Sequence, residues 1–198
     1  SADKKVTVIA DPPIELLAPR ADEVHVQATN ARFAGLTIGA VDLTLGGVGL
    51  VRREADSVEG LLTAVRVPTM LGSPASISSV GLSGPSSDLR AIITLSAKDV
   101  QPLASAAVEG QLGQKPTKVT LTAPDKVTVS ASGLNVRGTL VVDAGGGLVL
   151  ITTSPARFSG TVDILRPGPT QPLHLTGIAL RADGATLTAT VDASFFGG

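Results

Sequence analysis

The sequence predicts a β-dominated α+β fold, in which a long, curved antiparallel sheet wraps around one or two helices. Apolar and polar residues alternate in many segments, such as residues 24–29, and a period of two is typical of strands with one apolar face. Only two segments show a helical period. Turn residues follow one another at short intervals, which favours an antiparallel sheet over alternating strands and helices. At 198 residues, we expect one domain, residues 1–198.

Long strands are expected in the first half of the chain. Residues 6–9 and 23–30 alternate and are separated by prolines, which cannot donate to a strand ladder. Residues 32–50 form a longer strand that changes parity, because Leu36 and Ile38 share one face while Val41, Leu43 and Leu45 have the opposite parity. A bulge at Gly39 would return all of these side chains to one face and would bend the strand.

Two segments are predicted to be helical. In residues 57–67, apolar side chains recur at i, i+3, i+4 and i+7, a spacing that places them on one helical face. Residues 100–112 have a broader apolar face. Ser96 and Asp99 precede it as a candidate capping box, and Gly113 follows as a stop signal.

The second half is almost entirely β in its pattern. Residues 145–147 are three glycines and predict a turn, while residues 148–152 are apolar on both faces and predict a central strand covered on both sides. Asp183 and Gly184 predict a tight hairpin, because such turns require positive φ angles.

Composition excludes several classes of function. The net charge is −1 and the basic residues are scattered, which argues against nucleic-acid binding. There is no cysteine, so disulfides and thiolate metal sites are excluded, and no stretch is apolar enough to span a membrane. With no Tyr, no Trp and four Phe, the interior is aliphatic and would suit acyl chains. A plain Val- and Thr-rich β-protein would have the same composition.

No catalytic, metal or cofactor motif is evident. The segment around Ser83 is one residue short of a Gly-x-Ser-x-Gly nucleophile elbow and predicts a turn. His25 and His174 are far apart and would pair on a metal only if their strands adjoined. We therefore expect no enzyme activity, no cofactor and no metal.

Four segments follow one another in a recognisable order: EVHVQATNARFAGLTIGAVDLTLGGVGL, LRAIITLSAKDVQPLASAAVEGQL, KVTLTAPDKVTVSASGLNVRGTLVVDAGGGLVLITTSP and LHLTGIALRADGATLTATVDA. In this order they resemble the LmeA-like phospholipid-binding family (DUF2993). The resemblance implies an exported protein of the bacterial cell envelope with a curved sheet around a helix, and phospholipid held in an apolar groove. It implies no catalytic residues. Family members carry an amphipathic helix before the first strand, whereas here Val6 begins a strand almost at once.

The leading hypothesis is a lipid-binding or lipid-shuttling protein that holds acyl chains between sheet and helix. The candidate lining residues are Leu43, Leu61, Leu62, Val65, Met70, Leu103, Val108, Leu112 and Phe158. For each of them, an ordinary place in the core is the alternative. A lipid head group would require cations, and the nearest cluster is Arg52, Arg53 and Arg66.

The expected partners are phospholipid or fatty acid, with peripheral contact to a membrane and none to nucleic acid. Phe195 and Phe196 could touch that membrane or pack locally. We expect the protein to be exported, with any targeting segment already removed before Ser1. The rival hypothesis is a structural or interaction module that binds another protein through a sheet edge. An envelope hydrolase is a third, and it lacks candidate catalytic residues.

Overall fold

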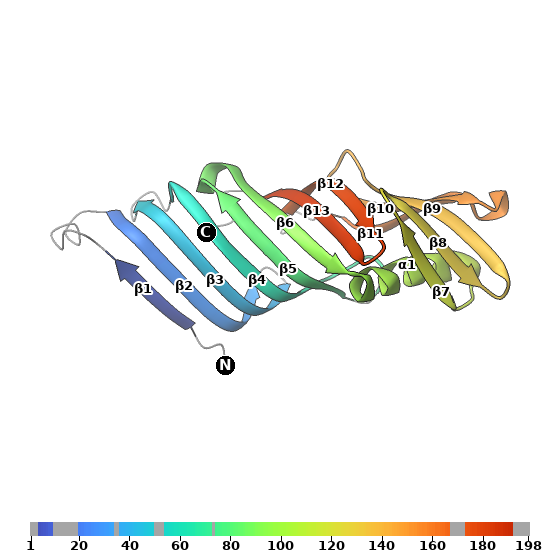
Figure 1. The fold of residues 1–198 in the computed structure, drawn as a ribbon, viewed down its shortest axis with the longest axis horizontal. Coiled ribbons are helices and arrows are strands. Elements are labelled where there is room, and N and C mark those ends of the chain that lie inside the picture. Colours follow the sequence, from blue (N-terminus) through green and yellow to red (C-terminus); the bar gives the residue numbers. More distant parts are fainter. Residues whose placement is uncertain are drawn as a thin grey trace.

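The fold consists of two antiparallel sheets and one α-helix. A computed structural model describes residues 4–9, 20–33, 36–49, 54–72, 74–166 and 173–191. Within these residues, thirteen strands form the two sheets, and the helix α1 (Ala97–Leu112) lies where they meet (Figure 1). The β-dominated α+β class predicted from the sequence is therefore confirmed.

The larger sheet has eight strands, in the order β1-β2-β3-β4-β5-β6-β13-β12. Its first six strands follow one another as antiparallel neighbours, and the last two return to the sheet at the end of the chain. The bounds are β1 (Lys4–Ile9), β2 (Arg20–Phe33), β3 (Leu36–Gly49), β4 (Ser57–Val67), β5 (Ala75–Gly84), β6 (Leu89–Ser96), β12 (Leu173–Arg181) and β13 (Gly184–Val191).

The smaller sheet has five strands, in the order β11-β10-β9-β8-β7. The bounds are β7 (Lys118–Thr122), β8 (Lys126–Ala131), β9 (Leu134–Val142), β10 (Leu148–Ser154) and β11 (Gly160–Leu165). Short 3₁₀ turns, η2 (Ser86–Asp88) and η3 (Ala156–Phe158), precede β6 and β11. Strand β10 is an interior strand, second in the order and not the central one that was predicted, and its residues 148–150 are buried while Ile151 is partly exposed. The predicted hairpin is confirmed, with Ala182 and Asp183 connecting β12 to β13 and Gly184 opening β13.

The helix predicted for residues 57–67 is wrong, because this segment is strand β4, paired with β3 and β5. The apolar side chains Val58 and Leu62 share one parity, and Val65 and Val67 share the other. Ala64 stands between the two runs with a φ of 51°. When a strand changes parity once, its apolar residues can have the same i, i+3, i+4 and i+7 spacing as one face of a helix. The sequence pattern therefore fits both structures, and hydrogen bonding to the neighbouring strands distinguishes them.

The parity change in β4 belongs to an irregular row that crosses four strands, which we call the crease. It consists of Asn30, Gly39, Ala64 and Ser78, one residue each from β2, β3, β4 and β5. On either side of it the pairing is regular and keeps its register: Thr29 pairs with Ala40, and Ala31 with Ile38. The same interruption recurs between β3 and β4 and between β4 and β5.

The crease keeps the apolar residues of all four strands on one face. Ile38 lies on one side of Gly39 and Leu43 on the other, with opposite parity, yet both belong to the same hydrophobic core. The change of face predicted at Gly39 is therefore confirmed, and it involves three neighbouring strands as well. The bulge predicted there is wrong, because the register with β2 and β4 continues without an extra residue. Gly39 is required by space, because a Cβ there would lie 2.8 Å from the Cβ of Ala64 and 3.2 Å from the carbonyl oxygen of Thr63.

In the first turn of helix α1, the carboxylate of Asp99 accepts three hydrogen bonds. The Asp99 Oδ2 accepts from the backbone N–H of Ser96 at 2.9 Å, from its hydroxyl at 2.8 Å and from the Ser78 hydroxyl at 2.6 Å. The predicted helix and its Ser96–Asp99 cap are thus confirmed, with the helix starting at Ala97 and stopping at Gly113, which has a φ of 63°. Because Ser78 lies in the crease, this contact also attaches the helix to the larger sheet.

The apolar side of α1 fills the space between the sheets. Ala104, Ala107 and Val108 are each about 1% exposed. The helix packs mainly on β5, β6 and β13 of the larger sheet and on β7, β8 and β11 of the smaller one. Backbone hydrogen bonds also join the sheets directly, from Leu180 N–H to the Pro124 carbonyl at 2.6 Å and from Leu175 N–H to that of Gly146 at 3.2 Å.

The crease generates a double-mutant prediction. Gly39→Ala places a methyl group against the Ala64 Cβ, and we expect it to lower the free energy of unfolding by about 1–3 kcal/mol. Ala64→Gly removes the opposing methyl group and the strain of a positive φ, so the double variant should recover part of this loss. Urea denaturation of the two single variants and the double variant measures the coupling. Strictly additive losses would contradict the contact.

A second prediction concerns the start of α1. Burial, the largest effect, raises the pKa of Asp99, but the hydrogen bonds from Ser78 and Ser96 together outweigh it and hold the pKa below its usual value. A carboxyl with a depressed folded-state pKa stabilises the fold above its unfolded pKa of about 3.9, and this contribution disappears as the pH falls through the folded value. We expect Asp99→Ala to cost about 1 kcal/mol at pH 7.

Denaturation of wild type and Asp99→Ala at a series of pH values tests this expectation. The difference between the two proteins should be constant above about pH 4 and should shrink below it. A difference that does not change with pH would show that the carboxylate charge has no part in the cap.

Candidate functional site

The main candidate is an apolar surface on β2, β3 and β4, which we call the inner apolar face. It consists of Val26, Val41, Leu43, Leu45 and Leu62, all half-buried. The register brings them together, since Val26 pairs with Leu43 and Val41 pairs with Leu62. Leu43 pairs with Gly60 on its other side, and its side chain occupies the space that a larger residue at Gly60 would need. The surface is therefore continuous and entirely aliphatic.

The inner apolar face is half-buried because the helix covers a different part of the sheet. In Figure 1, α1 lies beside β13 and β7, at the opposite end of the larger sheet from β1 and β2. Beyond the crease, Ile38, Val65 and Ile77 are fully buried, and so is Val80 in β5. Leu62 and Val41, which continue the row of Val80 into β4 and β3, are only partly buried, whereas Val24 and Val58, which flank Leu45, are buried.

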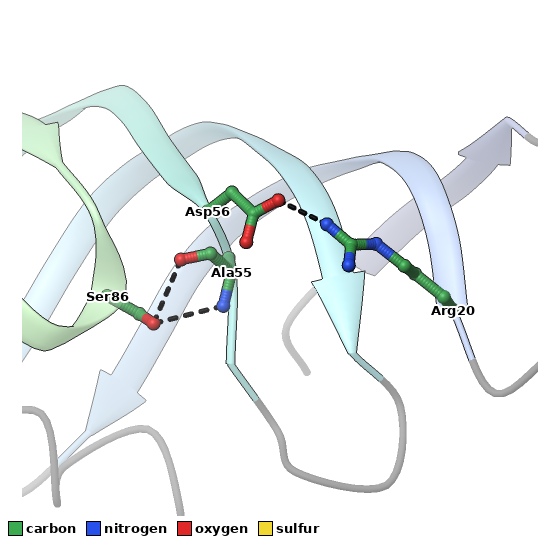
Figure 2. Close-up of polar contacts among 4 residues, drawn as sticks. All are labelled: Arg20, Ala55, Asp56 and Ser86. Carbon is green, nitrogen blue, oxygen red and sulfur yellow. Dashed lines mark hydrogen bonds and ion pairs between the residues drawn. The ribbon is translucent and has the colours of Figure 1, made fainter.

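Two sets of polar contacts, an ion pair and a pair of hydrogen bonds, lie at the end of β3, where the inner apolar face stops. The Arg20 guanidinium forms an ion pair with Asp56, and the Ser86 hydroxyl bonds to both the N–H and the carbonyl oxygen of Ala55 at 3.0 Å (Figure 2). Gly47, with a φ of 60°, leaves room for the pair, because a Cβ there would overlap the Asp56 carboxylate. These contacts therefore connect the segment before β4 to the start of β2 on one side and to the segment before β6 on the other.

Two of the sequence-predicted lining residues, Leu43 and Leu62, lie on the inner apolar face. Leu61 stands on the opposite, outer face of the sheet and is 47% exposed, because side chains alternate along a strand. Val65 and Val108 are 3% and 1% exposed and belong to the packed core.

The remaining predicted lining residues are dispersed. Leu103 on α1 and Phe158 in η3 are partly buried against the core, and the Arg157 guanidinium lies 4.9 Å from the centre of the Phe158 ring. Met70 is 63% exposed, and its N–H bonds to the Ile164 carbonyl oxygen at 3.1 Å. The side chain of Leu112 lies outside what the structure describes.

Of the three predicted head-group cations, Arg66 is the one that the structure describes, and it does not lie on the inner apolar face. Arg66 is exposed and alternates with Val65 and Val67, so it stands on the outer face. Arg52 and Arg53 fall outside the described residues, and so do Phe195 and Phe196.

On the outer face, a polar cluster spans β1 to β3. The His25 Nε2 lies 2.6 Å from the Asp42 Oδ1, and the Gln27 amide donates to the other carboxylate oxygen at 3.4 Å. The hydrogen bond with His25 is the main reason why the pKa of Asp42 lies below its usual value. A cavity of about 380 Å³ is lined by Asp42, Gln27 and Lys5 of this region and also by Val41, which belongs to the inner apolar face. No group of three potential metal ligands occurs among the described residues.

Sequence reasoning missed Val26, Val41 and Leu45 as site residues. The period-two pattern placed them on an apolar strand face, which is equally the pattern of core residues. The signal that separates them from the core is the position of α1 over β5, β6 and β13, and this is a property of the tertiary structure.

The comparisons with known proteins gave no match for this chain among protein-family models, curated proteins or solved structures. Within the described residues, no helix has the length and apolar character needed to cross a bilayer.

The placement of these residues predicts unequal costs of truncation. Val65→Ala should lower the free energy of unfolding by about 2 kcal/mol, because it removes two buried methyl groups and leaves a void. Leu61→Ala should change it by less than about 0.5 kcal/mol, because the side chain is half-exposed on the outer face. Urea denaturation of both variants measures the difference. Equal costs would contradict the assignment of Leu61 to the outer face.

Proposed function

We propose that the protein binds the acyl chains of a phospholipid or fatty acid on the inner apolar face. The observation that carries this proposal is the half-exposure of five neighbouring aliphatic side chains, Val26, Val41, Leu43, Leu45 and Leu62, on a part of the sheet that α1 leaves uncovered. The resemblance to LmeA-like phospholipid-binding proteins supports the same ligand class. The proposed role is carriage or shuttling of lipid without catalysis.

The chemistry of the face suits an acyl chain. Aliphatic side chains offer dispersion contacts and no directed hydrogen bonds, which matches a ligand that has no polar group along its length. Each buried methylene of the ligand contributes about 0.8 kcal/mol, so a chain covering only part of this surface would gain several kcal/mol.

An acyl carrier of this kind would act at a membrane surface, and we propose peripheral contact with the bilayer in the cell envelope after export. The exchange of lipid would take place where the inner apolar face approaches the bilayer.

A protein-interaction module is the second candidate, and one observation favours it. Leu61 and Ile92, which are 47% and 52% exposed, flank Gly81 in one row across β4, β5 and β6 on the outer face. Exposed aliphatic side chains that share a flat sheet face are suited to contact with another protein. This candidate predicts that the outer-face residues, and not the inner ones, govern binding.

Two adjacent leucines provide a matched test of the proposed function. Leu62→Gln changes the inner apolar face, and Leu61→Gln makes the same substitution one residue away on the outer face. We expect wild type to bind a fluorescent fatty acid saturably, Leu62→Gln to weaken this binding about tenfold, and Leu61→Gln to leave it unchanged. Displacement by unlabelled lipid establishes that the probe occupies a lipid site.

Thermal unfolding of both variants is the control, because a loss of binding counts only for a folded protein. No saturable binding by wild type would overturn the lipid proposal. An equal loss in the two leucine variants would remove the inner apolar face as its location.

A further inference from the structure

A cavity of about 580 Å³ lies between the first turns of α1 and the segment that leads into β7. We call it the lysine cavity. From α1 it is lined by Lys98, Gln101 and Ser105, and from the opposite wall by Pro116, Thr117 and Lys118. Its lining is more polar than apolar in character, unlike the aliphatic inner face, and none of its residues belongs to that face.

Two cations line this cavity, and neither forms an ion pair with a carboxylate of the described residues. The ion pairs formed by the described residues are Arg20–Asp56, His25–Asp42, Arg90–Asp88, Lys126–Asp125 and Arg166–Asp163, so neither Lys98 nor Lys118 has such a partner. Asp99 follows Lys98 in the chain, but its Oδ2 accepts hydrogen bonds from Ser78 and Ser96 and forms no ion pair with Lys98. An anion bound in the cavity would be attracted to the ammonium groups of both lysines.

Further hydrogen-bond donors complete the lining. The Gln101 amide and the Ser105 hydroxyl can donate to an anion, whereas the Thr117 hydroxyl already donates to the Ser130 carbonyl oxygen at 3.1 Å. Pro116 has no N–H and adds apolar surface. The two neutral donors therefore lie on α1, beside Lys98, and Lys118 at the start of β7 adds an ammonium group from the opposite wall.

We propose that the lysine cavity binds the phosphate group of a phosphate ester. A phosphate monoester carries a charge of about −1.5 to −2 at pH 7, which two lysines balance, and lysine recognises phosphate as a point charge. The volume lies within the range of about 300–1,000 Å³ that is usual for ligand pockets, so there is room for the group that the phosphate carries. A lipid head group and a soluble phosphate ester share this chemistry.

Calorimetry with glycerol 3-phosphate tests the soluble form of the ligand, with glycerol as the neutral reference. We expect saturable binding of the ester alone, weakened at least tenfold by Lys98→Gln with Lys118→Gln and reduced by added salt. The matched control is Lys115→Gln with Lys126→Gln, which removes the same charge from two exposed lysines outside the cavity lining. This control should bind like wild type.

Co-sedimentation with phosphatidylcholine vesicles, with and without phosphatidic acid, tests the lipid form. Vesicle binding that requires phosphatidic acid and is lost in the Lys98/Lys118 variant assigns a head group to the cavity, and binding of glycerol 3-phosphate alone assigns a soluble ester. Either result supports the proposal. No binding of either probe, or an equal loss in the control variant, overturns it.

The fluorescent fatty-acid measurement separates this inference from the proposed acyl-chain function. The Lys98/Lys118 variant should keep its affinity for the acyl probe, because no residue of the lysine cavity belongs to the inner apolar face. A negative result in one of the two binding experiments would therefore overturn the proposal for that site and leave the proposal for the other site unaffected.

Discussion

The constraint on which the rest of the structure depends is the alignment of four strand irregularities in one crease. A strand cannot change face alone without shifting its register against both neighbours. Because Asn30, Gly39, Ala64 and Ser78 lie in one row, all four strands change face together and the hydrogen-bond ladders continue unbroken in register on either side. The apolar side chains on both sides of the row then share one core.

The crease also connects the sheet to the helix. Ser78 donates to the same Asp99 oxygen that caps α1, so the position of the helix is tied to the row where the sheet changes face. The helix consequently covers β5, β6 and β13 and reaches across to the smaller sheet. What it leaves half-exposed on β2, β3 and β4 is the surface to which we assign acyl-chain binding.

The two proposed sites are chemically complementary. The inner apolar face offers only aliphatic carbon, and the lysine cavity offers charge and hydrogen-bond donors beside α1. A phospholipid contains both chemistries, whereas a fatty acid and a soluble phosphate ester contain one each. The measurements on the two sites therefore bear on which class of ligand the whole molecule accepts.

The sequence by itself determined the β-dominated class, the capped helix that ends at Gly113, the hairpin at Gly184 and the change of face at Gly39, because strand period, capping residues and positive-φ glycines act over a few residues. The tertiary structure decided that residues 57–67 form a strand, since their spacing fits both a helix and a creased strand, and only pairing with β3 and β5 distinguishes them. It also decided that Val65 is buried in the core while Leu43, packed against the same core, stays partly exposed. Both are apolar residues in strands, and what separates them is how far the helix extends over the sheet.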